Sequence, residues 1–209
     1  MEEREQLGEI LSSASQARET YSVTGVQRPG RGPAPTPTGA TERRSMDFVH
    51  DTLANGRPFR VPTVIDNWSR QSPVLEAGVR MSGETVGRAL DGVLGEGPGP
   101  RSITVDHGTE FQSRALEDWV YRRGVQLDFI RPGKPVENTF IELFNGRLRD
   151  ECLNVYQFAS IAEAHQIIEA WRLDYNQRRP HSSLGHLTPN EFVGLRQVIQ
   201  AVEEAVYSS

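Results

Sequence analysis

The chain has little cysteine and lysine and no long apolar segment. Cys152 is the one cysteine among its 209 residues, which excludes an internal disulfide framework and any zinc site built on several cysteines. No apolar run approaches the ~18 residues that indicate a membrane span. The first ten residues, MEEREQLGEI, are acidic and lack the apolar stretch of a secretory signal. These absences predict a cytoplasmic protein without a membrane partner.

Excess positive charge is also missing. The formal net charge is −5, which argues against a protein that binds nucleic acid through its overall charge. The basic residues of the C-terminal half gather as Arg147 with Arg149 and as Arg178 with Arg179. The acidic residues either face solvent or supply carboxylates that need a cation. Charge alone leaves both interpretations open.

Composition divides the chain into three parts. Residues 1–43 combine a short amphipathic helix, roughly residues 2–18, with a linker rich in proline and glycine, and this part is predicted to be partly disordered. Residues 44–195 form the predicted core, and residues 196–209 a helical tail. The length of the chain suits one well-packed domain.

Hydrophobic periodicity predicts an α/β domain built on one mixed, five-stranded sheet flanked by helices. The first three strands form an antiparallel meander, whose first turn carries the hairpin signal Asn55-Gly56. Two strand–helix–strand units follow, and such units join parallel strands through right-handed crossovers. The predicted strands are 45–50, 58–68, 73–80, 101–106 and 125–130, and the predicted helices are 83–94, 111–123, 138–154 and 160–176.

Glu142 stands inside an apolar run, between Ile141 and Leu143. A buried carboxylate is costly unless it is paired, hydrogen-bonded or bound to metal. If the region is helical, its apolar residues fall on one face and a polar stripe lies beside them, formed by Asn138, Glu142, Asn145 and Arg149. Most polar stripes are solvated helix surface, so Glu142 taken alone does not establish a site.

Two aspartates strengthen the case for a functional site. Asp47 lies within a predicted strand between Met46 and Phe48, a poor place for an unpaired charge. Asp106 ends the apolar strand RSITVD, and open α/β sheets bind ligands at the carboxyl ends of their strands. The alternative interpretation of Asp106 is a turn or helix-cap aspartate, because the turn-forming pair His107-Gly108 follows it.

Four blocks in succession carry a resemblance to a known family: RSMDFVHD, ITVDHGTEFQS, RPGKPVENTFIELFNGRLRDECLN and DYNQRRPHSSLGHLTPNEF. They make residues 44–193 similar to insertion-sequence transposases of the OrfB type, within the superfamily of DDE transposases and retroviral integrases. The resemblance implies an RNase H-like fold. It also implies that Asp47, Asp106 and Glu142 are the catalytic acids. Between the last two lie 35 residues, the separation known for that superfamily.

The resemblance further implies a chemistry and a set of partners. The three acids would hold two Mg²⁺ or Mn²⁺ ions, hard cations that prefer oxygen ligands and that in pairs serve in-line phosphoryl displacement. The implied activity is DNA cleavage at transposon ends and strand transfer to target DNA, in the bacterial cytoplasm and its nucleoid. The expected partners are DNA, further copies of the chain on that DNA, and a helix-turn-helix protein from an upstream reading frame.

Five polar residues are predicted to contact DNA, because such side chains bind phosphate without reading sequence. They are Lys134, Asn145, Arg149, Arg178 and Arg179. For the arginines, ion pairs or a structural role are the alternative. His181 and His186 suggest zinc only weakly, since no cysteine accompanies them. The three tryptophans are interpreted as core or helix-packing residues.

Two positions depart from the family pattern. Arg44 stands where tryptophan is usual, which predicts disturbed packing, and Leu143 replaces a common serine after Glu142. The N-terminal residues also show no recognisable helix-turn-helix. Two rival interpretations therefore stay open: a non-catalytic transposase remnant that binds DNA or a partner, and an RNase H-like nuclease that acts on RNA–DNA hybrids.

Overall fold

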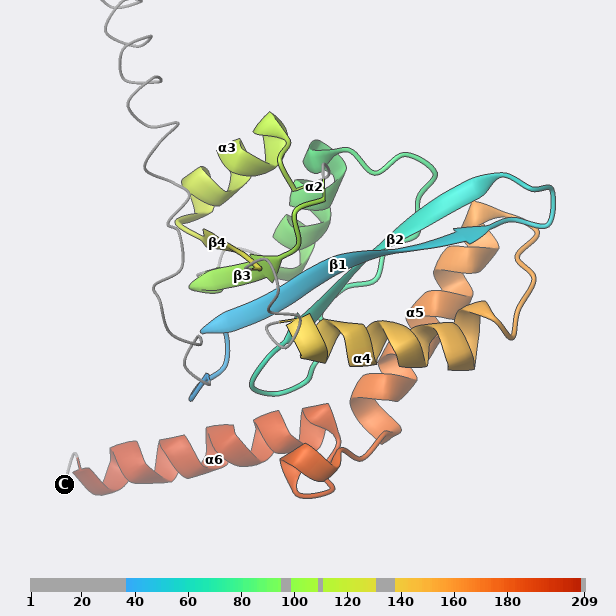
Figure 1. The fold of residues 1–209 in the computed structure, drawn as a ribbon. Coiled ribbons are helices and arrows are strands. Elements are labelled where there is room, and N and C mark those ends of the chain that lie inside the picture. The colour runs from blue at the N-terminus through green and yellow to red at the C-terminus, as the bar shows by residue number, and fades with distance from the viewer. Residues whose placement is uncertain (1–36, 95–98, 109–110, 131–137, 208–209) are drawn as a thin grey trace, which may run out of the picture.

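The computed structural model describes residues 37–94, 99–108, 111–130 and 138–207, and it shows a mixed sheet with helices on both faces (Figure 1). The strands follow the spatial order β2-β1-β3-β4. They are β1 (Arg43–Thr52), β2 (Pro58–Asp66), β3 (Ser102–Val105) and β4 (Gln126–Phe129). The helices are α2 (Gly83–Leu94), α3 (Arg114–Arg123), α4 (Thr139–Leu148), the π-helix η2 (Arg149–Leu153), α5 (Ile161–Arg178), the 3₁₀ helix η3 (Ser182–Leu184) and α6 (Pro189–Tyr207).

β1 and β2 form the predicted antiparallel hairpin, in a register that places Thr52 opposite Pro58. Gly56 in the connection has a φ of 79°, a left-handed conformation that glycine adopts without steric cost. Residues 53–57 connect the two strands, so the loop is longer than the two-residue turn that Asn55-Gly56 most often forms.

The predicted third strand, residues 73–80, is not formed, so the sheet has four strands within the described residues and the prediction of five is wrong. The segment reaches β2 only through isolated bridges. At one of them Arg60 and Gly78 exchange two backbone hydrogen bonds, each of 2.9 Å. Two residues further along β2, the backbone that faces the same way belongs to Pro62, which has no N–H to donate. Proline at this position prevents a continuous ladder of hydrogen bonds.

Of the two predicted crossovers, the second, from β3 through α3 to β4, is present; the first lacks its starting strand at residues 73–80, and α2 leads from β2 into β3 instead. β3 pairs in parallel with β1, and β4 pairs in parallel with β3. α3, which connects β3 to β4, begins after Ser113, whose hydroxyl accepts the N–H of Leu116, and ends at Gly124 with a φ of 63°. These are the two kinds of residue that cap a helix at its beginning and end. The cap also explains why α3 starts three residues later than the predicted helix.

Side chains that alternate along the strands separate two apolar clusters, one on each face of the sheet. Met46 and Phe48 of β1 pack with residues of α2 and α3. Val49 packs on the opposite face with residues of α4, η2 and α5. Figure 1 shows these two helical layers on either side of the strands. Asp47 lies between Met46 and Phe48 in the sequence, so its side chain faces the layer that contains α4.

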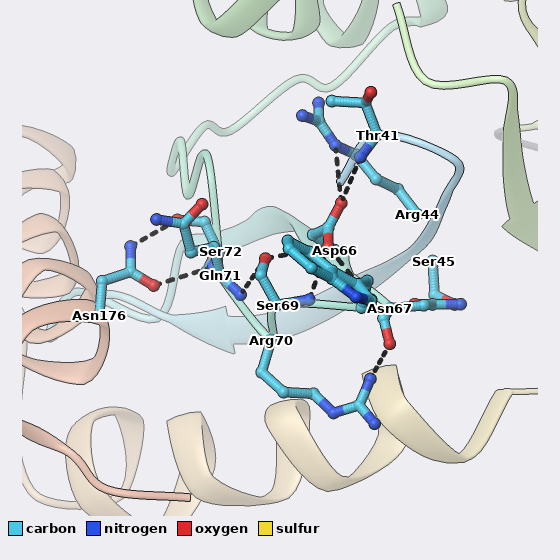
Figure 2. A network of polar contacts seen from close by, with 11 residues as sticks. Thr41, Arg44, Ser45, Asp66, Asn67, Ser69, Arg70, Gln71, Ser72 and Asn176 are labelled. Carbon is cyan, nitrogen blue, oxygen red and sulfur yellow. Dashed lines mark hydrogen bonds and ion pairs between the residues drawn. The ribbon is translucent and has the colours of Figure 1, made fainter. Parts of the chain in front are cut away.

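A polar network at the end of β2 accommodates Arg44 (Figure 2). Arg44 is buried, and its Nε lies 4.0 Å from Oδ2 of Asp66. Burial lowers the pKa of Arg44, while the charge of Asp66 raises it. The Asp66 carboxylate also accepts hydrogen bonds from the backbone N–H groups of Thr41 (3.2 Å) and Ser69 (2.8 Å). Arg44 is therefore the ion-pair partner of a well-anchored carboxylate, while its buried Nε and Nη1 have no hydrogen-bond partner within the described residues.

The predicted boundaries fall partly outside the described residues. The N-terminal helix and most of the linker lie within residues 1–36, outside the described residues. α6 runs from Pro189 to Tyr207 without a break, across the predicted boundary at residue 195. The division into three parts therefore stays a prediction. No helix in the described part of the chain has the length and apolar character needed to cross a membrane.

Candidate active site

The three predicted acids come from three neighbouring elements. Asp47 lies within β1, Asp106 follows directly after β3, and Glu142 occupies the first turn of α4. The parallel register of β1 and β3 places Ser45 opposite Thr104. Two residues further along both strands, the same register brings Asp47 and Asp106 to one level of the sheet. This level lies under α4, which carries Glu142.

Asp47 is the electrostatic centre of this arrangement. Burial raises the pKa of Asp47, and the negative charges of Asp106 and Glu142 raise it further. Two hydrogen bonds act in the opposite direction and lower this pKa: one from the N–H of Phe48 to Oδ1 (2.7 Å), and one from Nδ2 of Asn145 to Oδ2 (2.9 Å). The pKa of Asp47 is raised on balance, chiefly by burial, and the charges of Asp106 and then Glu142 contribute less.

Asn145 holds the Asp47 carboxylate. Its side chain is only 8 % exposed, because α4 packs on the sheet with this residue turned inward. Nδ2 donates to Asp47, whereas Oδ1 has no hydrogen-bond partner within the described residues. The DNA contact predicted for Asn145 does not match this placement. The sequence pattern identified the residue as part of the polar stripe but did not show which way that stripe faces.

Asp106 is half-buried and Glu142 is exposed, so solvent reaches both carboxylates. Oδ1 of Asp106 accepts the N–H of Gly108 (2.8 Å), so the residue also makes the turn contact of the alternative interpretation. Glu142 is exposed, and the following Leu143 has 63 % of its surface exposed. A leucine in place of serine at residue 143 therefore does not disturb the core.

The predicted DNA-contacting arginines have different surroundings. Arg149 is exposed at the start of η2. Arg178 is also exposed, with its Nη1 3.7 Å from Oδ1 of Asp174. Arg179 is engaged by Asp174 (3.0 Å) and by Glu151, as its structural alternative predicts. Lys134 lies outside the described residues.

The donor set suits a hard divalent cation by its chemistry, because all three acids offer carboxylate oxygens. A bound cation would relieve the repulsion that the negative charges of Asp106 and Glu142 exert on Asp47. Across the described ranges, however, no three His, Cys, Asp or Glu side chains lie close enough together to hold an ion as they stand. Asn145 turns Asp47 toward α4, the helix that carries Glu142.

Two further residues, which local sequence patterns do not reveal, join segments around the sheet: Arg70 contacts α4 beside the candidate site, and Asn176 contacts the segment after β2. Arg70 adopts a left-handed φ of 61° and stacks 3.6 Å from the ring centroid of Phe140, two residues before Glu142. Asn176 of the DYNQRRP block joins α5 to the segment after β2, by accepting the N–H of Ser72 (2.9 Å) and donating to its carbonyl (2.8 Å) (Figure 2). Each contact joins segments far apart in the chain.

We expect Asp47→Asn to raise the melting temperature at pH 7 in the absence of divalent metal. Since the pKa of Asp47 is raised in the folded chain, ionisation is less favourable there than in the unfolded chain, and the free energy of unfolding falls as pH rises through that pKa. The gain should shrink as pH falls and wild-type Asp47 becomes protonated. Thermal scans from pH 7 downward measure it.

The matched control for this prediction is Asp51→Asn. Asp51 lies on the same strand and accepts the N–H of its own following residue, Thr52 (2.7 Å), as Asp47 does from Phe48. A lower melting temperature for Asp47→Asn than for wild type at every pH would contradict the prediction.

Comparisons with known proteins agree on one family. Two family profiles, both described as "Integrase core domain", match residues 37–135 and 123–189. An uncharacterized 31.7 kDa protein of insertion element IS407 from Burkholderia multivorans is 45 % identical over 156 residues, which are 75 % of this chain and 56 % of that protein. Transposase InsF for insertion sequence IS3A from Escherichia coli is 30 % identical over 161 residues, 74 % of this chain and 54 % of that protein. The chain thus spans about half the length of these relatives.

Solved structures share the fold. The integrase catalytic core domain of HTLV-2 in complex with magnesium, in a trimeric form, has a TM-score of 0.56 and 16 % identity, and covers 78 % of this chain and 99 % of that chain. The simian T-cell lymphotropic virus intasome gives a TM-score of 0.56 at 17 % identity, over 76 % of this chain and 56 % of that chain. The RNase H-like, integrase-core architecture is therefore confirmed, apart from the number of strands.

Proposed function

Because the chain belongs to the family of integrase core domains, we propose that it is a transposase core that catalyses phosphoryl transfer on DNA. It cuts at the ends of an insertion sequence and joins those ends to target DNA. The proposed place of this activity is the nucleoid DNA of the bacterial cytoplasm, and the similarity to insertion-sequence proteins of bacteria supports it.

The observation that carries the proposal is that acids from three separate parts of the chain meet at one level of the sheet, where the register of β1 and β3 aligns Asp47 with Asp106 and the helix that carries Glu142 is bonded to Asp47 through Asn145. Asp106 and Glu142 both raise the pKa of Asp47, although 35 residues lie between Asp106 and Glu142. Like charges brought together at a cost are typical of sites that work with a cation. A purely structural carboxylate is instead paired with a base, as Asp66 is with Arg44.

We assign the metal-binding role to Asp47, Asp106 and Glu142, with Mg²⁺ or Mn²⁺ as the cations and two ions as the proposed number. The related HTLV-2 core was solved in complex with magnesium. Such ions, when bound, lower the pKa of an attacking water or 3′-hydroxyl and stabilise the leaving oxygen. Asn145 orients Asp47 by its hydrogen bond. Glu142, which is exposed, remains accessible to the phosphate backbone of DNA.

Arg149 and Arg178 are the proposed phosphate contacts. Both are exposed, and Arg149 lies two helical turns beyond Glu142 on the same side of the helix. Lys134 remains a proposed contact from its position in the chain. Arg179 has its charge balanced by two carboxylates and is a weaker candidate. A helix-turn-helix partner for recognition of the element ends also stays a proposal.

The activity is tested with the purified full chain on labelled DNA duplexes that carry the ends of its own element, with supercoiled plasmid as target. We expect nicking and joining that require Mg²⁺ or Mn²⁺. A parallel reaction contains an RNA–DNA hybrid, which should remain intact. Cleavage of the hybrid alone would support the nuclease interpretation, and DNA binding without any cleavage would support the non-catalytic remnant.

Metal binding gives an independent test. We expect millimolar Mg²⁺ or Mn²⁺ to raise the melting temperature, because a ligand bound only by the folded state stabilises it by about 1.4 kcal/mol at ten times its Kd. Glu142→Gln should remove most of this shift. Glu117→Gln is the matched control, since Glu117 also lies in the first turn of a helix, α3. An equal shift in wild type and in Glu142→Gln would place the ion elsewhere.

A further inference from the structure

α6 is a long helix with almost no support from the rest of the molecule. Pro189 is its one buried residue, and residues 194–207 are exposed along their whole length. Figure 1 shows α6 extending away from the sheet and its two helical layers. Most helices in proteins depend for their stability on an apolar face that packs against other elements.

The exposed part of α6 carries such an apolar face. Leu195, Ile199, Val202 and Val206 are 49 %, 39 %, 58 % and 66 % exposed. Their spacing of four, three and four residues is the spacing of a coiled-coil seam. Val198, 62 % exposed, widens the same stripe. Contiguous exposed apolar side chains of this kind mark an interaction surface.

We propose that this stripe, formed by Leu195, Val198, Ile199, Val202 and Val206, is a self-association surface that pairs with α6 of a second copy in antiparallel orientation. The stripe is self-complementary in that orientation. When Ile199 lies opposite Val202 of the second copy, Leu195 lies opposite Val206 of the second copy, and two-fold symmetry repeats both layers. Every layer is then apolar on both sides.

Charge decides the orientation. In the antiparallel pair, the positions that flank the seam bring Arg196 opposite Glu203 of the second copy, and symmetry makes this contact twice. Glu203 has no hydrogen bond or ion pair within the described part of its own chain. A parallel pair would direct Arg196 toward Glu191 of the second copy, whose carboxylate already accepts the N–H of Thr188 (2.9 Å) at the start of α6.

This pairing goes beyond the proposed catalytic function and does not depend on it. It holds two cores together through their C-terminal helices, with the candidate active sites on separate elements. The seam is short, so we expect a reversible dimer and not an obligate one.

The first test is sedimentation of the full chain over a range of concentrations. We expect a monomer–dimer equilibrium that Ile199→Asp shifts toward monomer, with a dissociation constant raised about tenfold or more, because the dimer would bury an unpaired carboxylate. Gln197→Asp, on the opposite side of the same helix, is the matched control and should leave the equilibrium unchanged. Circular dichroism checks that the core stays folded in both variants.

The second test uses charge reversal. Arg196→Glu and Glu203→Arg should each weaken self-association, because each places like charges opposite one another twice. An equimolar mixture of the two variants should dimerise at least as well as wild type. Failure of the mixture to recover would overturn the antiparallel pairing. A wild-type chain that is monomeric at every concentration would overturn the proposal. If α6 is then also protected from hydrogen exchange, the stripe is covered by residues 1–36 of the same chain.

Discussion

Glu142→Gln is expected to reduce DNA cleavage and joining by about 10³-fold or more, because a carboxylate that holds a catalytic cation contributes several kcal/mol of transition-state stabilisation. The same substitution should leave the free energy of unfolding within about 0.5 kcal/mol of wild type, since exposed side chains away from special contacts contribute little. Glu142 is exposed in the first turn of α4. Single-turnover assays and urea denaturation of the same preparations measure the two effects.

Glu117→Gln controls for the loss of an acidic residue near a helix N-terminus, where it interacts favourably with the helix dipole. Its activity should match that of wild type. If Glu142→Gln kept its cleavage and joining activity, the proposed role of Glu142 in metal-dependent catalysis would be contradicted. Loss of activity together with loss of folding would instead give Glu142 a structural role.

Phe144→Ala is expected to lower the free energy of unfolding by about 3–5 kcal/mol, the usual cost of removing a buried aromatic side chain. Phe144 is 2 % exposed. Its ring centroid lies 5.5 Å from that of Trp171 and 5.0 Å from that of Tyr175, both edge-on. The substitution opens a cavity between α4 and α5 in the layer that supports Asn145 and Glu142. Equilibrium urea denaturation gives the difference.

Leu143→Ala is the matched control, because the two residues are neighbours on α4 but Leu143 is 63 % exposed. It should change the free energy of unfolding by less than about 0.5 kcal/mol. Comparable losses in the two variants would mean that α4 does not pack on the sheet with the face that contains Phe144.

Strand and helix periods identified most elements of the fold correctly. The helix predicted over residues 83–94 has the bounds of α2, and the parallel crossover from β3 through α3 to β4 is present. The error concerns residues 73–80, whose composition is compatible with a strand. Pro62 on the neighbouring strand removes the donor that a third strand would need, and only the register of β2 shows that its missing N–H faces that way.

The site shows the same division between local and long-range information. Residue types and spacing drew attention to Asp47, Asp106 and Glu142, since a carboxylate within an apolar strand or helix is unusual wherever the chain folds, and the family resemblance proposed them together as the catalytic acids. They did not show that Asn145 turns inward to hold Asp47, or that Arg44 meets Asp66. Each of these contacts depends on which face a second helix or strand turns toward the residue.

Residue order therefore accounts for most of the secondary structure, because hydrogen bonding and side-chain alternation are local properties of the backbone, and its resemblance to a known family proposes the three acids. The folded chain alone establishes the register of β1 against β3, the charge coupling at Asp47 and the exposure of the α6 stripe. These depend on how separate elements pack against one another. The free energy of packing comes from contacts between two surfaces, and no single segment contains both of them.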